Sequence, residues 1–396
     1  MVVRSRPLRT SVVHSPAVYH PRWRHLASVV LSLSIMIIVE ELPVHSADVR
    51  PSQSMIPQRG YVYHFPRDHG SHDHFLLEWW YVTGHLFTED GRRFGYELTF
   101  FRRKLEDPRI AENPSRWALR HLYFAHFALT DVEHRSFQFA EKLSRAGIGK
   151  AGAPPGRLDV WIDRWHLRAT TSDHRKLHLE AQTRTFGLAL DLLAQKNPVI
   201  HGEKGVSRKG EREEEASHYY SLTRLRTMGE VHVGSARWRV TGVSWMDHEF
   251  GSGQMAHNVV GWDWFSLQLD SNMEVMVYLL RQTDGTPHPA SSGTVVFPDG
   301  QYQHLPLSQI RLTVHEFWKS PHSGAKYPAS WTLDIRSLGL SAKILPLLPD
   351  QELQTPSTQV TYWEGAVDVS GIYRGQAVTG TGYVELTGYA HPLQLK

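Results

Sequence analysis

Cysteine is absent from this chain of 396 residues. Its absence excludes disulfide bonds, thiolate metal ligands, a cysteine nucleophile and a lipid anchor on cysteine. Hydrophobic residues nevertheless make up 41% of the sequence and aromatic residues 11%, enough for one large core or two ordinary ones. The fold therefore has to be held together by its core and by backbone hydrogen bonds.

Several catalytic and cofactor motifs are also absent. No G-x-S-x-G elbow occurs, so the nucleophile of a standard α/β-hydrolase is not expected. HEFGS (248–252) and HEFWK (315–319) both lack the second histidine of the H-E-x-x-H zinc motif. A phosphate loop and a G-x-G-x-x-G segment are missing as well. We therefore expect no nucleotide cofactor.

A long apolar run is missing from the N-terminal region. The run from residue 26 to residue 39 follows five arginines but is shorter than the roughly 20 residues that span a bilayer. This pattern predicts a signal peptide over residues 1–47, and hence a protein exported to the periplasm or outside the cell. An uncleaved N-terminal anchor is the alternative, because Glu40 and Glu41 interrupt the end of the run. Peripheral contact with a membrane stays open.

An excess of basic charge is missing from the rest of the chain. The sequence holds 43 Lys and Arg against 40 Asp and Glu, and residues 1–47 contribute five arginines and two glutamates. Residues 48–396 are therefore formally neutral. A nucleic-acid-binding protein would keep a basic stripe outside its leader, so we expect no nucleic-acid partner. The sequence says nothing about the oligomeric state.

The remainder of the chain is rich in short runs that alternate apolar and polar residues. Examples are WWYVTGHLF (79–87), RFGYELTFFR (93–102), HLYFAHFALTD (121–131) and VMVYLLRQ (275–282). Such runs, separated by Gly, Pro, Asp and Asn, are typical of antiparallel strands and hairpins. The fold class is therefore mainly β. Only the regions 139–147 and 304–310 suggest short helices.

A faint duplication indicates two similar β domains. Residues 79–103 and 262–281 both read as an aromatic strand, a polar turn and a second strand that ends in arginine. We expect an N-terminal domain over 48–225 and a C-terminal domain over 226–396. The charged stretch 201–218 is expected to be a loop that joins the halves or lies over a cavity.

The stretch GVSWMDHEFGSG (242–253) is the densest in chemically active residues. On a strand, Trp245, Asp247 and Glu249 share one face, whereas His248 points to the other face. This alternation disfavours a metal site made jointly by Asp, His and Glu. Two carboxyls beside a tryptophan suit proton transfer instead, because like charge and apolar surroundings favour the neutral acid. In the alternative, both acids face solvent or pair with arginines such as Arg237.

Two further stretches suggest a cavity for an apolar ligand. GWDWFSLQLD (261–270) and LLEWWYVTGHL (76–86) concentrate aromatic residues around single acids, and deep ligand cavities combine aromatic walls with a few polar groups. An acid such as Asp263, facing an apolar layer, is costly unless it is paired. The predicted ligand-binding residues are Trp79, Trp80, Tyr81, Trp262, Asp263 and Trp264.

A histidine-rich segment, HFPRDHGSHDH (64–74), carries enough imidazoles and carboxylates to bind a divalent metal. Its Gly, Ser and Asp content favours a solvated loop instead. We therefore expect no metal site.

Five ordered stretches between about residues 60 and 390 carry a resemblance to a known family: EWWYVTGHL (78–86), YYSLTRL (219–225), GVSWMDHEFGS (242–252), GWDWFSLQLD (261–270) and YWEGAVDVSGIYRGQAVTGTGYVELTGY (362–389). Together they resemble the AttH-like, CrtC-type group. This group includes carotenoid 1,2-hydratases (hydroxyneurosporene synthases) and many exported proteins designated secreted hydrolases.

The resemblance implies two lipocalin-like β-barrel domains packed together, and a reaction that adds water to an isolated double bond without cofactor or metal. Asp247 occupies the position of the aspartate in the family's motif, and the resemblance implies that it is the proton donor. Trp245 and His248 match the aromatic residue before and the histidine after that aspartate. Glu249 is added from local chemistry. The alkene would be protonated, the cation held by aromatic faces, and water would follow.

The predicted function is thus the hydration of a hydrophobic molecule, isoprenoid or lipid-like, by an exported protein. This protein's motif, W-M-D-H-E-F-G, resembles the secreted branch more than the pigment-pathway hydratases. A carrier of lipophilic molecules without enzymatic activity is the main alternative. A secreted hydrolase of unknown substrate is a third.

Overall fold

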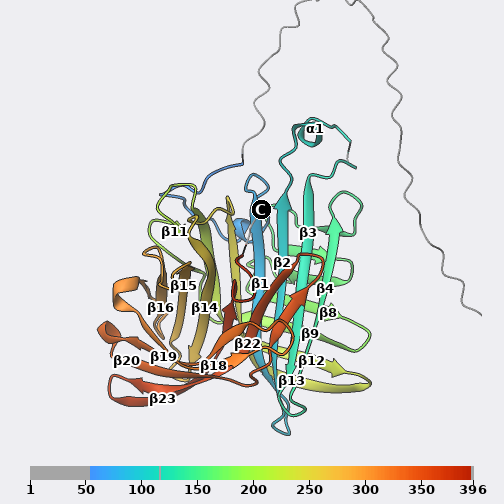
Figure 1. The fold of residues 1–396 in the computed structure, drawn as a ribbon. Helices are drawn as coiled ribbons and strands as arrows, with labels where there is room; N and C mark the ends of the chain where they lie inside the picture. Colours follow the sequence, from blue (N-terminus) through green and yellow to red (C-terminus); the bar gives the residue numbers. More distant parts are fainter. Residues whose placement is uncertain (1–53, 116, 394–396) are drawn as a thin grey trace, which may run out of the picture. The chain divides into compact units, whose positions relative to one another are not determined.

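The computed structural model describes residues 54–115 and 117–393, and strands dominate them (Figure 1). The helical elements of this part are α1 (Pro108–Ala111) and the short 3-10 turns Arg67–His69, Leu307–Gln309 and Arg336–Leu338. Within it, no helix is long and apolar enough to cross a membrane. The expected signal peptide lies outside the described residues and stays a prediction.

The first sheet has 13 strands. Its main path runs β4-β3-β2-β1-β13-β12-β9-β8-β7-β6-β5, and β10 and β11 pair with β12. Its strands are β1 (Leu77–Phe87), β2 (Arg93–Lys104), β3 (His121–Asp131), β4 (Ser136–Arg145), β5 (Ala151–Gly152), β6 (Asp159–Ile162), β7 (Trp165–Ala169), β8 (Lys176–Gln182), β9 (Phe186–Ala194), β10 (Val199–Ile200), β11 (Ser207–Arg208), β12 (Ala216–Val233) and β13 (Ala236–Gly251).

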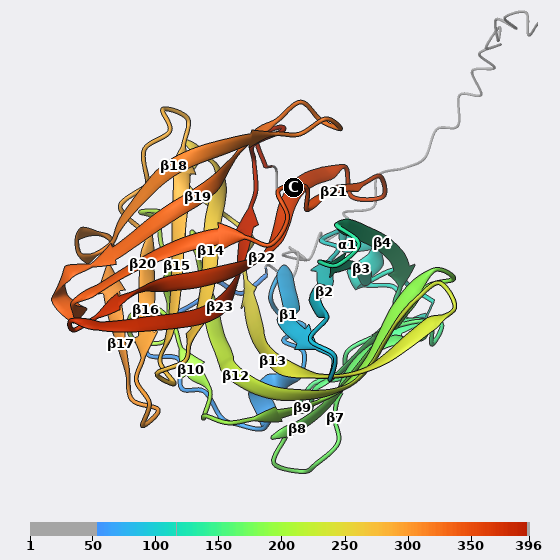
Figure 2. The same ribbon diagram turned by 90° about the horizontal axis from the view of Figure 1, so that it is seen from below.

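The second sheet has ten strands and runs β17-β16-β15-β14-β23-β22-β20-β19-β18, with β21 paired to β22. Its strands are β14 (Val259–Leu269), β15 (Glu274–Gln282), β16 (Ser292–Val296), β17 (Tyr302–Pro306), β18 (Arg311–Lys319), β19 (Lys326–Ile335), β20 (Leu340–Pro346), β21 (Glu352–Thr355), β22 (Val360–Tyr373) and β23 (Gln376–Leu386). Figure 2 shows the two curved sheets beside each other.

Both sheets follow one topology. In each, a four-stranded meander is followed by a later hairpin that pairs with the meander's first strand: β13 pairs with β1, and β23 with β14. The predicted duplication and the two-barrel, mainly β fold are therefore confirmed. The predicted domain boundary after residue 225 falls inside β12, whereas the chain passes from one sheet to the other between Gly251 and Val259.

The β1–β2 hairpin shows how local sequence builds these sheets. Its strands pair without a bulge from Leu77↔Arg103 to Phe87↔Arg93, and the alternation of their side chains gives each strand a face toward each side. The turn needs a residue with positive φ, which Gly91 provides at φ +86.

The three largest clusters of buried side chains fill most of the interior of the described residues. One occupies the inside of the first sheet and includes Val82, Leu98 and Met246. Another occupies the inside of the second sheet and includes Phe265 and Trp331. The third lies between the sheets and is largely aromatic: Tyr81, Tyr219, Trp245, Trp264, Tyr278 and Tyr383 are among its members. Ligand space is therefore to be sought between the sheets, because each sheet's own interior is packed.

Two local expectations about secondary structure were wrong. Residues 139–147, expected to be helical, lie mainly in β4, and the 304–310 region forms the end of β17 followed by a 3-10 turn. Antiparallel pairing of the 136–145 segment with β3, from Asp131↔Ser136 to Leu122↔Arg145, overrides its helical composition.

Candidate active site between the two sheets

A row of side chains crosses the outer face of the first sheet. Register pairs link His126 to Thr99, Thr99 to Tyr81, Tyr81 to Asp247 and Asp247 to Ser221. Residues that are directly opposite in antiparallel strands point to the same face. We call this row, from β3 to β12, the first rung.

The second sheet presents an equivalent row, the second rung, in which Glu364 pairs with Glu385, Glu385 with Trp264, and Trp264 with Tyr278. The shared topology makes Glu385 on β23 the counterpart of Asp247 on β13. Side-chain hydrogen bonds join the two rungs: Tyr81 donates to Glu364 Oε2 at 2.9 Å. The two sheets thus face each other through their acid-bearing rungs.

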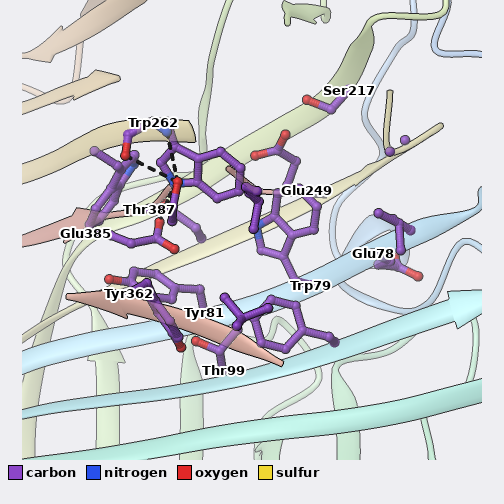
Figure 3. Close-up of a pocket in the computed structure, with 18 of the residues that line it drawn as sticks. Glu78, Trp79, Tyr81, Thr99, Ser217, Glu249, Trp262, Tyr362, Glu385 and Thr387 are labelled. Carbon is purple, nitrogen blue, oxygen red and sulfur yellow. Dashed lines mark hydrogen bonds between the residues drawn. The ribbon is translucent and has the colours of Figure 1, made fainter. Parts of the chain in front are cut away.

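A cavity of about 420 Å³ lies between the rungs, within the range of small-molecule sites. Figure 3 shows Trp79, Tyr81, Trp262 and Glu385 gathered around it, with Glu78 at its far edge. Its aromatic wall includes Trp79, Tyr81, Phe101, Phe124, Trp262 and Trp264. Lys209, Ala216 and Ser217 also line it, so the charged stretch 201–218 borders the cavity and does not join the sheets.

Asp247 lies on the cavity wall and is held by three neutral donors. Tyr219 donates to Oδ2 at 2.6 Å and the Trp245 indole donates to Oδ1 at 2.6 Å. The Ser221 hydroxyl also donates to Oδ1. Burial raises the pKa of Asp247 to about 7, against the opposing effect of these hydrogen bonds. The acid and carboxylate forms are therefore both accessible near neutral pH.

Tyr219 connects Asp247 to the cavity and to the second sheet. Its hydroxyl accepts a hydrogen bond from the Trp264 indole at 3.0 Å while it donates to Asp247, and its side chain lines the cavity. When Asp247 is protonated, the carboxyl can donate to Tyr219, whose own proton then turns toward the cavity. The pair can thus pass a proton in either direction.

Ser221 is held on its other side by His201, whose Nε2 lies 2.6 Å from the hydroxyl. Both side chains are fully buried and neither lines the cavity. A nucleophilic serine needs access to its substrate. Ser221 has none, so this Asp–Ser–His chain orients Asp247 and does not form a hydrolase triad.

Glu249, two residues further along the same face, also lines the cavity and pairs with Lys209 at 3.0 Å. Burial alone would lower the pKa of Lys209, but the charge and hydrogen bond of Glu249, together with Tyr278 and Asp247, outweigh burial and the pKa lies above its ordinary value. This pair is ionic, unlike Asp247 with its neutral donors. Neither acid contacts Arg237, which pairs with Glu230 at the surface.

The second rung carries acids without basic partners among the described residues. The Trp262 indole donates to Glu385 at 2.7 Å, and burial raises the pKa of Glu385 to about 7. Burial, together with the charges of Glu385 and Glu97, raises the pKa of Glu364 well above its ordinary value. The cavity is thus bordered by carboxyl groups that hold protons near neutral pH.

The opposite face of β13 is ionic. His248 Nε2 lies 2.8 Å from Glu78 Oε1, and the Arg102 guanidinium pairs with Glu78 Oε2 at 2.8 Å. Although burial alone would raise it, Arg102, His248 and His72 hold the pKa of Glu78 well below its usual range. His248 therefore faces away from Asp247, as the alternation predicts, and it does not line the cavity.

The histidine-rich segment packs against this face. Asp68 and His69 are buried, and the His72 ring stacks on Phe250 at 3.5 Å, so the expectation of a solvated loop was wrong. His72, Glu78 and His248 bring three ligating atoms within 4.8 Å of one another. Glu78 already pairs with Arg102, however, and that charge opposes a cation on the same carboxylate. The partly exposed group His166, His178 and Glu180 is the other with such spacing in the described part.

Comparison with known proteins adds the family. The AttH-like family model matches residues 56–389. The chain belongs to the AttH-like family. A crystal structure of an AttH-type protein from Nitrosomonas europaea is 32% identical, with a TM-score of 0.74, covering 83% of this chain and 98% of that one.

Two further relatives of this AttH-like chain are hydratases. Kievitone hydratase of Fusarium solani subsp. phaseoli is 23% identical over 246 residues, which is 60% of this chain and 68% of that protein. The crystal structure of kievitone hydratase from Nectria haematococca has a TM-score of 0.64 at 18% identity and covers 86% of this chain and 98% of that one. The latter likeness concerns the fold.

The structure separates the predicted ligand-binding residues of this AttH-like chain. Trp79, Tyr81, Trp262 and Trp264 line the cavity. Trp80 does not: it is 1% exposed, packs in the core of the first sheet and stacks on His248. Strand alternation sends it to the opposite face from its two neighbours.

Asp263 does not line the cavity either. It points to the other face of β14, where it pairs with Arg281 at 2.5 Å and accepts a hydrogen bond from Tyr389. Burial raises its pKa to about 6. The cost of facing an apolar layer is met by an arginine at the end of the neighbouring strand, so Asp263 has a structural partner and no ligand role.

Several cavity residues of the AttH-like chain were not singled out from its sequence. A glutamate inside an otherwise apolar strand, as in YWEGAV and YVELTG, is the signal that would have found two of them. His126 carries no such signal, because it depends on the pairing of β2 with β3. The missed cavity residues are His126, Lys209, Tyr219, Tyr362, Glu364 and Glu385, and the buried Ser221 that binds Asp247 was missed as well.

Proposed function

We propose that this AttH-like protein adds water to a carbon–carbon double bond of a hydrophobic molecule, isoprenoid or lipid-like, without a cofactor. Asp247 is the proton donor. The observation that carries the proposal is a buried acid with a pKa of about 7, hydrogen-bonded only by neutral donors, on the wall of an aromatic cavity. A general acid works best with a pKa near the ambient pH.

In the first step the proton moves from Asp247, directly or through the Tyr219 hydroxyl, to one carbon of the double bond. The electron pair of the π bond forms the new C–H bond, which leaves a carbocation on the other carbon and a carboxylate at Asp247. The indole faces of Trp79, Trp262 and Trp264 border the cavity, and aromatic faces stabilise a cation by about 2 kcal/mol or more when desolvated.

In the second step a water molecule supplies its oxygen to the carbocation. Glu249 lies two residues after Asp247 and is held in place by its ion pair with Lys209. It accepts a hydrogen bond from that water and orients it. The proton that the water loses returns to the Asp247 carboxylate, so the acid is restored. The sum of the two steps is alkene plus water to alcohol, with no net change in the protein.

The relatives support this reaction class. Kievitone hydratase, a protein that hydrates kievitone by its name, shares 23% identity over 246 residues with this chain. Carotenoid hydration is the finer form of the proposal, drawn from the resemblance to CrtC-type sequences. The aromatic cavity supports an apolar substrate in general, whereas no described residue selects a carotenoid.

A carrier of lipophilic molecules is the second candidate function. The three donors around Asp247 are also what a structural carboxyl at the end of β13 would have. The carrier would bind the same molecules and release them unchanged. A secreted hydrolase has less support, because the buried Ser221 is screened from the cavity.

We also propose that the protein is exported and that residues 1–47 are removed on the way. The support is the arginine-rich, apolar leader in the sequence. N-terminal sequencing of the protein purified from the native cell fractions tests this: a start near residue 48 in the exported fraction is expected. An intact leader in the membrane fraction would indicate the anchored alternative.

Turnover in heavy-oxygen water tests the hydration. Acyclic isoprenoid alkenes such as farnesol and squalene are incubated with the protein, and products are analysed by mass spectrometry for one added water that carries the label. Asp247→Asn should lower the rate by about 100-fold or more, the usual range for a general acid. Asp191→Asn, at an exposed position on β9, is the control and should keep the rate. Full turnover by Asp247→Asn would rule out the assigned role.

A further inference from the structure

The first rung extends well beyond Asp247. His126 lies three strands away, through Thr99 and Tyr81, and three strand spacings amount to about 14 Å. His126 and Asp247 line the same cavity. A ligand with its double bond at Asp247 therefore reaches along the rung toward β3.

This far end of the cavity is polar. His126 Nδ1 lies 2.6 Å from the Tyr362 hydroxyl of the second sheet, while Nε2 has no hydrogen-bond partner among the described residues. The side chain lines the cavity and is only 2% exposed. Burial lowers the pKa of His126 to about 3, so the ring is neutral and can accept or donate one hydrogen bond through Nε2.

Glu364 offers a second unpaired atom at this end. Its Oε2 accepts the hydrogen bond from Tyr81, whereas Oε1 has no partner within the described ranges, and the residue is 1% exposed. It shares a face of β22 with Tyr362, two residues earlier, and both line the cavity. Burial raises the pKa of Glu364 well above its ordinary value, which favours the acid form that can donate as well as accept.

A buried polar atom without a partner costs about 1–3 kcal/mol. A hydroxyl group both donates and accepts, so it matches a neutral imidazole and a neutral carboxyl, whereas a hydrocarbon leaves both unsatisfied. A carboxylate ligand can only accept hydrogen bonds, and burial of its charge is costly unless the charge is paired. The chemistry at this end therefore selects an uncharged hydroxyl-bearing group.

We propose that His126, Tyr362 and Glu364 form a polar subsite that binds a hydroxyl group of the ligand, so that the substrate is an unsaturated alcohol or phenol and not a pure hydrocarbon. The inference rests on the proposed function for the position of the double bond. It makes His126 and Glu364 specificity-determining residues, separate from the acid Asp247.

Calorimetric titration with farnesol and with the hydrocarbon of the same carbon skeleton tests the subsite. We expect farnesol to bind the wild type at least about tenfold more tightly, since one satisfied buried polar atom is worth that much. In the double variant His126→Phe, Glu364→Leu the ratio should fall to near one. Glu364→Gln, which keeps both hydrogen-bonding functions, should keep the preference, as should the surface control Asp191→Asn.

Equal affinity of the wild type for the alcohol and the hydrocarbon would overturn the subsite. So would an unchanged preference in the double variant. These experiments measure binding and not turnover, so the subsite and the proposed function can fail separately. If the protein prefers farnesol but forms no hydrated product, the hydratase proposal is wrong and the subsite proposal is supported. If both compounds are hydrated and bind with equal Kd, the hydratase proposal is supported and the subsite proposal is wrong.

Discussion

Asp247 and Glu78 are two buried carboxyls on neighbouring strands, and they differ in almost everything except burial. Asp247 faces the cavity and accepts hydrogen bonds from a tyrosine, a serine and a tryptophan. Glu78, on the other face of the sheet, is bonded to Arg102 and two histidines. The pKa of Asp247 is raised to about 7, whereas that of Glu78 is held well below its ordinary value.

Burial alone therefore does not set the charge of an acid. Burial raises both pKa values, and a cationic partner reverses the effect at Glu78 where neutral donors only reduce it at Asp247. On one face of β13, His248 contacts the fixed charge of Glu78, whereas on the other face Asp247 has a movable proton beside the ionic Glu249–Lys209 pair. Each of the following predictions tests that division.

Removal of the charge at Glu78 should have the largest effect. Glu78→Gln leaves Arg102, 0% exposed, without its counter-charge, and breaking one partner of a buried ion pair typically costs about 3–5 kcal/mol. Urea unfolding at neutral pH measures the loss. Asp247→Asn is the matched control, since it leaves no buried cation behind, and should lose far less. Equal losses in the two variants would contradict the division.

The pH dependence of stability should separate the same two acids. The pKa of Asp247 is about 7 in the folded protein and near 3.8 in the unfolded chain, so the folded state binds the extra proton. Its stabilising contribution is complete below the unfolded value and is lost as the pH rises through about 7. Relative to Asp247→Asn, the wild type should therefore lose about 4 kcal/mol over this interval.

Urea unfolding of both proteins at a series of pH values measures this difference. The contribution of Glu78 to stability should depend on pH in the opposite direction. Because its pKa is depressed in the folded protein, this contribution is present above the pKa of the unfolded chain and is lost as the pH falls. Parallel stability curves for the wild type and Asp247→Asn would mean that Asp247 keeps its ordinary pKa.

A smaller effect is expected when one neutral donor is removed. Trp245→Phe deletes the indole N–H that supports the Asp247 carboxylate, so the acid form is favoured and the pKa should rise further, by about one unit. The alkaline limb of the pH–rate profile should move up by the same amount. Trp262→Phe, whose indole serves Glu385, is the control and should leave that limb in place.

Most of what could be predicted from the sequence followed from the alternation of side chains along strands. This alternation correctly separated Asp247 from His248, and it placed Trp262 and Trp264 together on one face of their strand, which lines the cavity. The same rule, applied consistently, would have excluded Trp80 and Asp263 from the cavity. The fold class and the duplication were also within reach, because the β1–β2 and β14–β15 hairpins repeat in pattern and in topology.

The remainder depended on contacts between distant strands. Nothing local shows that His126 lies on the same rung as Asp247, or that Glu364 meets Tyr81 across the two sheets. Nor does composition show that the histidine-rich segment 64–74 packs against Phe250 and Glu78. The location of the cavity between the sheets follows from the filled interiors of both, which is a property of packing.

The most direct measurement of the central claim is the pKa of Asp247 itself. Carbon NMR of protein labelled at the aspartate carboxyl carbons, recorded across a pH series for the wild type and for Asp247→Asn, reports each carboxyl separately. We expect one aspartate signal that titrates near pH 7 and is missing from the spectrum of the variant. An Asp247 signal that titrates near the ordinary value of 3.8 would contradict it, because a carboxylate at neutral pH cannot protonate an alkene.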